Sequence, residues 1–135
     1  MNGKQFDHNV ITCSPRLGTA EIWNFVNNSG GWMHPIHIHF EEHQILWRNG
    51  KLPPADEIAR EDVIWLGHGE TVKTFRRFRD FTGRYPTHCY NVVHEDHAMM
   101  IRIAPLTVAR QRTVGEGRML GVFHHHFILR RTLEI

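Results

Sequence analysis

The residues with the most distinctive chemistry in this chain lie between His88 and Met99. Cys89 is followed by His94 five positions later and by Met99 five positions after that. A thiolate, an imidazole and a thioether from one short segment are soft metal ligands. A distant second imidazole would complete a His₂Cys site with a weak axial methionine, a ligand set that suits an electron-transferring copper ion.

A second cluster, His34-Pro35-Ile36-His37-Ile38-His39, offers that distant imidazole. Side chains alternate between the two faces of a strand, so His37 and His39 should point the same way. For the same reason, the neighbours His88 and Cys89 should face opposite sides of their strand. We therefore expect two metal compartments, one on each side of this strand. The first would contain His34, Cys89, His94 and Met99, and the second would contain His37, His39 and His88.

Two other chemistries also use cysteine and histidine. Cys89 and His94 could form a thiol nucleophile and its base, but this leaves Met99 and the cluster around His34 without a role. A structural zinc site prefers several thiolates in paired spacings, whereas this segment has one. Copper accounts for more of these residues than either alternative. The remaining single histidines are interpreted as surface or hydrogen-bonded core residues: His8, His43, His68 and His97.

The composition is typical of one ordinary globular domain. The chain has 135 residues, of which 41% are hydrophobic and 22% charged, as expected for a globular protein. A net charge of +2 is too small to indicate a nucleic-acid partner or a membrane surface. No apolar run approaches the roughly 20 residues of a membrane span, and the N-terminus lacks a secretory pattern. A cytoplasmic protein, a processed chain and a piece of a longer chain all stay open.

Short apolar segments separated by glycine, proline and asparagine favour an all-β fold. We expect strands near residues 19–27, 44–48, 63–66, 71–81 and 99–103, the last of these being the final strand. Asn49-Gly50 is a hairpin signal, and residues 53–62 form a loop with room for one helical turn. Arg76, Arg77 and Arg79 are assigned to the solvated face of their strand. Many short strands without an amphipathic helix predict a β-sandwich.

The two histidine segments resemble the C-terminal cupredoxin domain of multicopper oxidases, a family that includes laccases and bilirubin oxidase. That family carries a His-x-x-His-x-His segment and a His-Cys-His-x3-His-x4-Met segment. Residues 34–39 and 88–99 follow these patterns in the same order, apart from Tyr90. The match runs from about Asn2 to about Ile103. The resemblance implies a cupredoxin-like Greek-key β-sandwich over residues 1–104, lacking its first strand. Residues 105–135 would then be an atypical basic, histidine-containing tail.

The resemblance also implies roles for individual residues. Type 1 copper would be bound by His34, Cys89, His94 and Met99. His37 would be a type 2 ligand, and His39 and His88 type 3 ligands. A small-molecule or metal-ion reductant would give electrons to type 1 copper, and Cys89 and His88 would pass them to a trinuclear cluster that reduces O₂. We therefore expect a copper-dependent oxidoreductase that is one domain or subunit of a larger assembly, with a partner chain or homo-oligomer completing the cluster. The family suggests a periplasmic, extracellular or spore-associated location.

Three departures from the family pattern limit this expectation. Tyr90 stands where the family has a type 3 histidine, and a phenol is a poor substitute for imidazole at copper. The N-terminal cupredoxin domain, which supplies two further His-x-His pairs in the family, has no counterpart in this chain. The missing first strand would leave an open sheet edge. An electron-transfer module without oxidase activity, or a truncated fragment, is therefore the alternative.

The tail offers one answer to the open edge. Residues 122–129 are hydrophobic enough to form a strand that covers it, and they contain a His-x-His pair, His124 and His126. Copper binding by this pair is a hypothesis that rests on the motif alone. A tail without a role in the site is the simpler interpretation.

Overall fold

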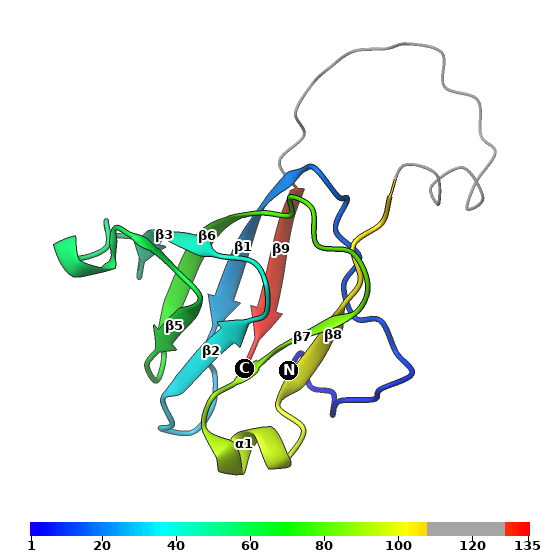
Figure 1. Ribbon diagram of the computed structural model, residues 1–135. Helices are drawn as coiled ribbons and strands as arrows, with labels where there is room; N and C mark the ends of the chain where they lie inside the picture. The colour runs from blue at the N-terminus through cyan, green and yellow to red at the C-terminus, as the bar shows by residue number, and fades with distance from the viewer. Residues whose placement is uncertain (108–128) are drawn as a thin grey trace.

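The computed structural model describes residues 1–107 and 129–135, which form two β-sheets packed face to face (Figure 1). One sheet contains, in spatial order, β4 (Arg60–Glu61), β3 (His43–Arg48), β6 (Thr71–Arg77), β1 (Ala20–Val26) and β9 (Leu129–Glu134). The other contains β5 (Val63–Leu66), β2 (His34–Ile38), β7 (Tyr85–Cys89) and β8 (Met100–Ile103). A short helix, α1 (Val92–Asp96), joins β7 to β8, and a 3₁₀ turn, η1 (Ala55–Glu57), lies between β3 and β4. The predicted cupredoxin-like β-sandwich is confirmed.

Strand β1 shows how sequence alternation builds the core. Every second residue of a strand faces the same side, and Glu21, Trp23 and Phe25 are fully buried while their neighbours are partly exposed. The Trp23 ring lies 6.0 Å from the ring of Phe78, which follows β6. The strand predicted over residues 19–27 is therefore confirmed. Within the described residues, no helix has the length and hydropathy needed to cross a bilayer.

The Asn49-Gly50 turn forms as the sequence predicts. Both residues have a positive φ, 51° for Asn49 and 76° for Gly50, which a tight hairpin turn requires of both central residues. Arg48 and Lys51 exchange backbone hydrogen bonds of 2.8 and 3.0 Å across it. The loop that follows contains η1, in agreement with the predicted helical turn.

The assignment of Arg76 to a solvated face is wrong. Its residue surface is 1% exposed, and its guanidinium lies 4.3 Å from the centre of the Trp23 ring and 5.1 Å from that of Phe25. Burial lowers the pKa of Arg76 to about 9, while the aromatic faces attract the buried cation. The prediction placed Arg76 in solvent because charged side chains are mostly exposed. In the structure, the alternation of side chains along β6 directs it into the core.

The prediction that the final strand ends near Ile103 is also wrong. Strand β9 pairs in parallel with β1, from Glu21 opposite Leu129 to Val26 opposite Glu134. It thereby covers the edge of β1 that we expected to be open. Residues 122–128, including His124 and His126, lie outside the described part of the chain. The division at residue 104 stays a prediction.

A buried ion pair fastens β9 to its neighbour. Arg131 donates hydrogen bonds to the Glu21 carboxylate from Nε at 2.6 Å and from Nη2 at 3.0 Å. Trp23 Nε1 donates a third, at 2.8 Å. Leu133, two residues after Arg131, is 5% exposed and joins the hydrophobic core. The C-terminal strand is therefore held by a charged contact and an apolar one.

Candidate metal centre

Strands β2 and β7 and helix α1 bring three potential ligands together at one end of the sandwich. Cys89 Sγ lies 3.7 Å from His34 Nδ1 and 3.6 Å from His94 Nδ1. A nitrogen at about 2.0–2.1 Å and a sulfur at about 2.3 Å from a shared ion are about 3.6–3.8 Å apart at tetrahedral to trigonal angles. The spacing of these donor atoms therefore fits a single metal ion. Cys89 and His34 are buried, and His94 is half-buried.

The loop between β7 and β8 closes on itself and places Met99 beside this group. Asn91 caps the start of α1 by accepting a hydrogen bond from the Val93 amide. Met99 donates its backbone N–H to the His94 carbonyl at 3.0 Å, and its own carbonyl accepts from the Cys89 amide at 3.2 Å. The backbones of Cys89, His94 and Met99 are thus tied together, and the Met99 side chain packs against the core.

Three further histidines form a second group. His39 Nε2 and His88 Nε2 lie 3.2 Å apart, and one donor nitrogen of His37 joins them within 4.8 Å. Two nitrogens on one ion at about 2.0–2.1 Å would be about 3.3 Å apart at a tetrahedral angle. On the outer side, His37 Nδ1 lies 3.0 Å from the Asp62 carbonyl, and His88 Nδ1 lies 3.5 Å from a Glu95 carboxylate oxygen. Such outer contacts orient imidazole ligands at metal sites.

Tyr90 covers part of the second group. Its ring stacks on that of His37 with centroids 4.5 Å apart and an interplanar angle of 9°, and it meets the His88 ring edge-on at 5.3 Å. The Tyr90 side is open to solvent, since the residue is 49% exposed. The sequence placed Tyr90 at a ligand position of the family, but the stacking contact could not be inferred from it.

The surroundings favour the neutral forms of three of these side chains, His34, His39 and Cys89. The pKa of His34 is lowered by burial and then by His94. Burial, followed by His37 and His88, lowers the pKa of His39. Burial raises the pKa of the Cys89 thiol. Neutral imidazole is the form that binds metal, and a bound cation deprotonates a coordinating thiol.

The residues that support the two histidines of the first group were not predicted from the sequence. Ser29 Oγ lies 2.9 Å from His34 Nε2, and the Trp32 ring meets the His94 ring edge-on at 5.2 Å. Asn27 contacts both segments, through Ser29 and through the Trp32 carbonyl. These residue types are common in loops, and their spacing does not show that they contact the histidines.

Comparison with known proteins identifies the family. Residues 1–107 match the profile of the multicopper oxidases. The chain belongs to the multicopper oxidase family. It is 38% identical over 106 residues to a bilirubin oxidase of Albifimbria verrucaria and 38% identical over 104 residues to a laccase of Haloferax volcanii. The crystal structure of a multi-copper oxidase from Pediococcus acidilactici superposes with a TM-score of 0.75 at 31% identity.

This chain corresponds to only part of those relatives. The matched regions cover 74% and 75% of this chain but 18% of the bilirubin oxidase and 18% of the laccase. The structural match covers 80% of this chain and 23% of the Pediococcus protein. The chain therefore spans about a fifth of the length of the relatives that it matches.

Proposed function

We propose that this multicopper oxidase domain takes electrons from a reducing substrate at a type 1 copper held by His34, Cys89, His94 and Met99. The observation that carries the proposal is the pair of distances from Cys89 Sγ to His34 Nδ1 and His94 Nδ1, 3.7 and 3.6 Å. One thiolate and two imidazoles at this spacing, with a nearby methionine, favour copper over zinc. Copper bound at this position would supply one-electron transfer.

The surface around His94 suits a reductant with apolar character. His94 is half-buried, and the exposed side chains of Trp32, Val92 and Val93 are close to it in the chain or in contact with it. An apolar rim beside a partly exposed ligand would dock a small aromatic molecule and exclude water from the contact.

The peptide bond between His88 and Cys89 offers a covalent path for electrons between the two groups. Cys89 belongs to the first group and His88 to the second, so a few covalent bonds join the two. The second group offers the imidazoles of His37, His39 and His88. We propose that it contributes to a trinuclear copper site that reduces O₂, with the other ligands supplied by a further domain, a partner chain or another copy of this chain.

A copper-binding electron-transfer module without oxidase activity is the second candidate. Tyr90 favours it, because an exposed phenol stacked on His37 occupies the place of a family histidine. Copper content separates the two functions. One copper per chain without O₂ consumption supports the module, whereas four coppers per assembled unit with O₂ consumed supports the oxidase.

The first test is the visible spectrum of the copper-loaded chain. We expect an intense blue absorption that is lost in Cys89→Ser, while metal is retained at the group of His37, His39 and His88. Cys13→Ala is the matched control, because Cys13 is the other buried free cysteine and is not a member of either group. Equal spectra for the wild type and Cys89→Ser would contradict the proposed type 1 site.

A further inference from the structure

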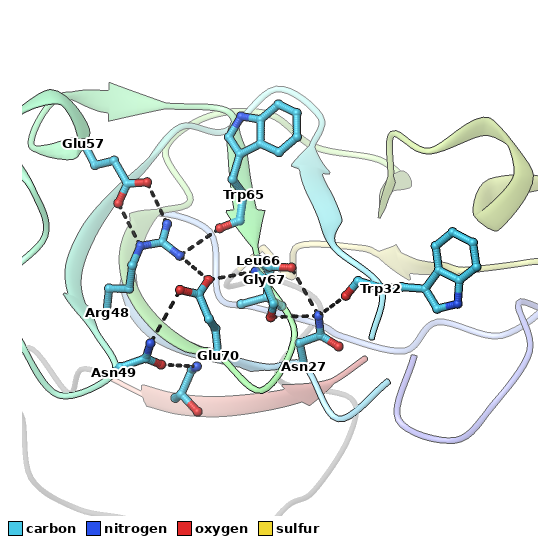
Figure 2. A network of polar contacts seen from close by, with 10 residues as sticks. Asn27, Trp32, Arg48, Asn49, Glu57, Trp65, Leu66, Gly67 and Glu70 are labelled. Atoms are coloured by element: carbon cyan, nitrogen blue, oxygen red, sulfur yellow. Dashed lines mark hydrogen bonds and ion pairs between the residues drawn. The ribbon is translucent and has the colours of Figure 1, made fainter. Parts of the chain in front are cut away.

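The side-chain amide of Asn27 has its orientation fixed by three carbonyl groups. Asn27 is fully buried, and its Nδ2 donates to the carbonyls of Trp32 at 2.8 Å, Gly67 at 2.9 Å and Leu66 at 3.2 Å (Figure 2). Carbonyl oxygens accept hydrogen bonds and cannot donate them. The end of the amide that faces them must therefore be the NH₂ group, which leaves Oδ1 facing Ser29.

Ser29 is then forced to act as a donor toward Asn27. Its backbone N–H and its hydroxyl lie 3.0 and 2.6 Å from Asn27 Oδ1. An amide oxygen only accepts, and a hydroxyl has a single hydrogen, so the Ser29 hydroxyl donates to Asn27. Ser29 Oγ also lies 2.9 Å from His34 Nε2. With its hydrogen already committed, it can only accept there, so His34 Nε2 carries the proton.

A neutral imidazole that is protonated at Nε2 has its lone pair on Nδ1. In His34 this nitrogen faces Cys89 Sγ at 3.7 Å, so the lone pair points at the place where the first group could hold an ion. We propose that Asn27 and Ser29 are positioning residues that hold His34 as its Nε2–H tautomer and so prepare Nδ1 to bind copper. This inference rests on the proposed function of the first group.

Asn27 also reaches the second imidazole of the same group. It donates a hydrogen bond to the backbone carbonyl of Trp32. The Trp32 ring in turn meets the His94 ring edge-on at 5.2 Å. The backbone of Asn27 is held in turn, since its N–H donates to the Glu70 carbonyl and its carbonyl accepts from Gly69. One buried amide thus braces the segments that contact both histidines of the first group.

The same network extends to the surface. Glu70 Oε2 accepts hydrogen bonds from the Gly67 amide at 2.7 Å and from Arg48 Nη1 at 2.6 Å. Arg48 also donates to both carboxylate oxygens of Glu57, at 2.7 and 3.0 Å (Figure 2). These bonds fix the loop that presents the Leu66 and Gly67 carbonyls to Asn27. Because these carbonyl acceptors are fixed in place, the NH₂ and oxygen ends of the Asn27 amide cannot exchange positions.

The first experiment reads the tautomer in the metal-free protein. Long-range ¹H–¹⁵N correlation spectra of the histidine rings distinguish protonated from unprotonated nitrogens. We expect His34 to show a protonated Nε2 and an unprotonated Nδ1 at a pH where the ring is neutral. A protonated Nδ1 would overturn the inference, whatever metal the site binds.

The second experiment measures copper(I) affinity by competition with a chelator. Ser29→Ala removes the acceptor, and loss of an outer partner of a metal-binding histidine typically weakens affinity by about 10- to 100-fold. Ser29→Thr keeps the hydroxyl and should restore affinity near the wild-type value. Thr19→Ala is the matched control, because it also removes a hydroxyl that donates to a backbone carbonyl, that of Arg16. Neither Thr19 nor Arg16 belongs to either histidine group.

The outcomes separate this inference from the proposed function. Wild-type affinity in Ser29→Ala would overturn the role of Ser29. Equal copper affinity in the wild type and in Cys89→Ser would overturn the proposed site. The spectra of the metal-free protein would still test the tautomer.

Discussion

Replacement of Arg131 by methionine should cost the protein a large part of its stability. The Glu21 carboxylate is fully buried and accepts three hydrogen bonds, two from Arg131 and one from Trp23. Breaking a buried ion pair by removing one partner costs about 3–5 kcal/mol, because the remaining charge is left without compensation. The Arg131 side chain is 31% exposed, so water can partly replace it. We therefore expect a loss of about 3 kcal/mol, against a total of about 5–15 kcal/mol for a domain.

Urea unfolding followed by tryptophan fluorescence measures this loss. Arg130→Met is the control, because Arg130 is the exposed neighbour on the same strand, and it should change stability by less than about 0.5 kcal/mol. In the double variant Glu21→Gln/Arg131→Met, the loss should be smaller than the sum of the single losses, since the unpaired charge is gone. A loss below about 1 kcal/mol for Arg131→Met, or an additive double variant, would refute the claim that this pair anchors β9.

Three further predictions concern buried and exposed residues near the two groups. Burial lowers the pKa of His43 to about 2 from 6.5, so below pH 6.5 the unfolded chain takes up a proton that the folded chain does not. His43 alone should lower stability by about 2 kcal/mol between about pH 6.5 and about pH 5, and in urea unfolding the fall should be smaller by about that amount in His43→Phe. Asn27→Ala should lose about 1–3 kcal/mol, because buried carbonyls lose their donor; the exposed neighbour variant Asn28→Ala should match the wild type, and equal losses would contradict the prediction. Tyr90→His adds an imidazole beside His37 and should raise copper content and O₂ consumption; no change would show that Tyr90 does not limit the second group.

The sequence was sufficient to predict which residues gather at the two groups. Short motifs lie on strands that pair directly, with Ile36 opposite Cys89 and His37 opposite His88. Because alternation along a strand is a local property, the assignment of neighbouring residues to different groups followed from spacing alone. The roles of these residues in binding copper stay predictions.

Features that depend on distant partners could not be predicted in this way. The Arg76 side chain points into the core, where its guanidinium contacts the rings of Trp23 and Phe25, more than 50 positions earlier in the chain. Asn27 donates hydrogen bonds to carbonyls about 40 positions away, and the local sequence does not reveal such partners. Strand β9 finds its place by pairing with β1 at the other end of the chain. In each case the sequence shows the residue but not the distant partner that determines its structural role.

The adjacency of His88 and Cys89 on β7 constrains how the chain can change over evolutionary time. A shift of one residue in a strand moves every side chain to the opposite face. An insertion or deletion before His88 that slipped the register of β7 would therefore turn the thiol away from His34 and His94 and turn the imidazole into the core. Related chains should therefore keep the same number of residues between Tyr85 and Cys89.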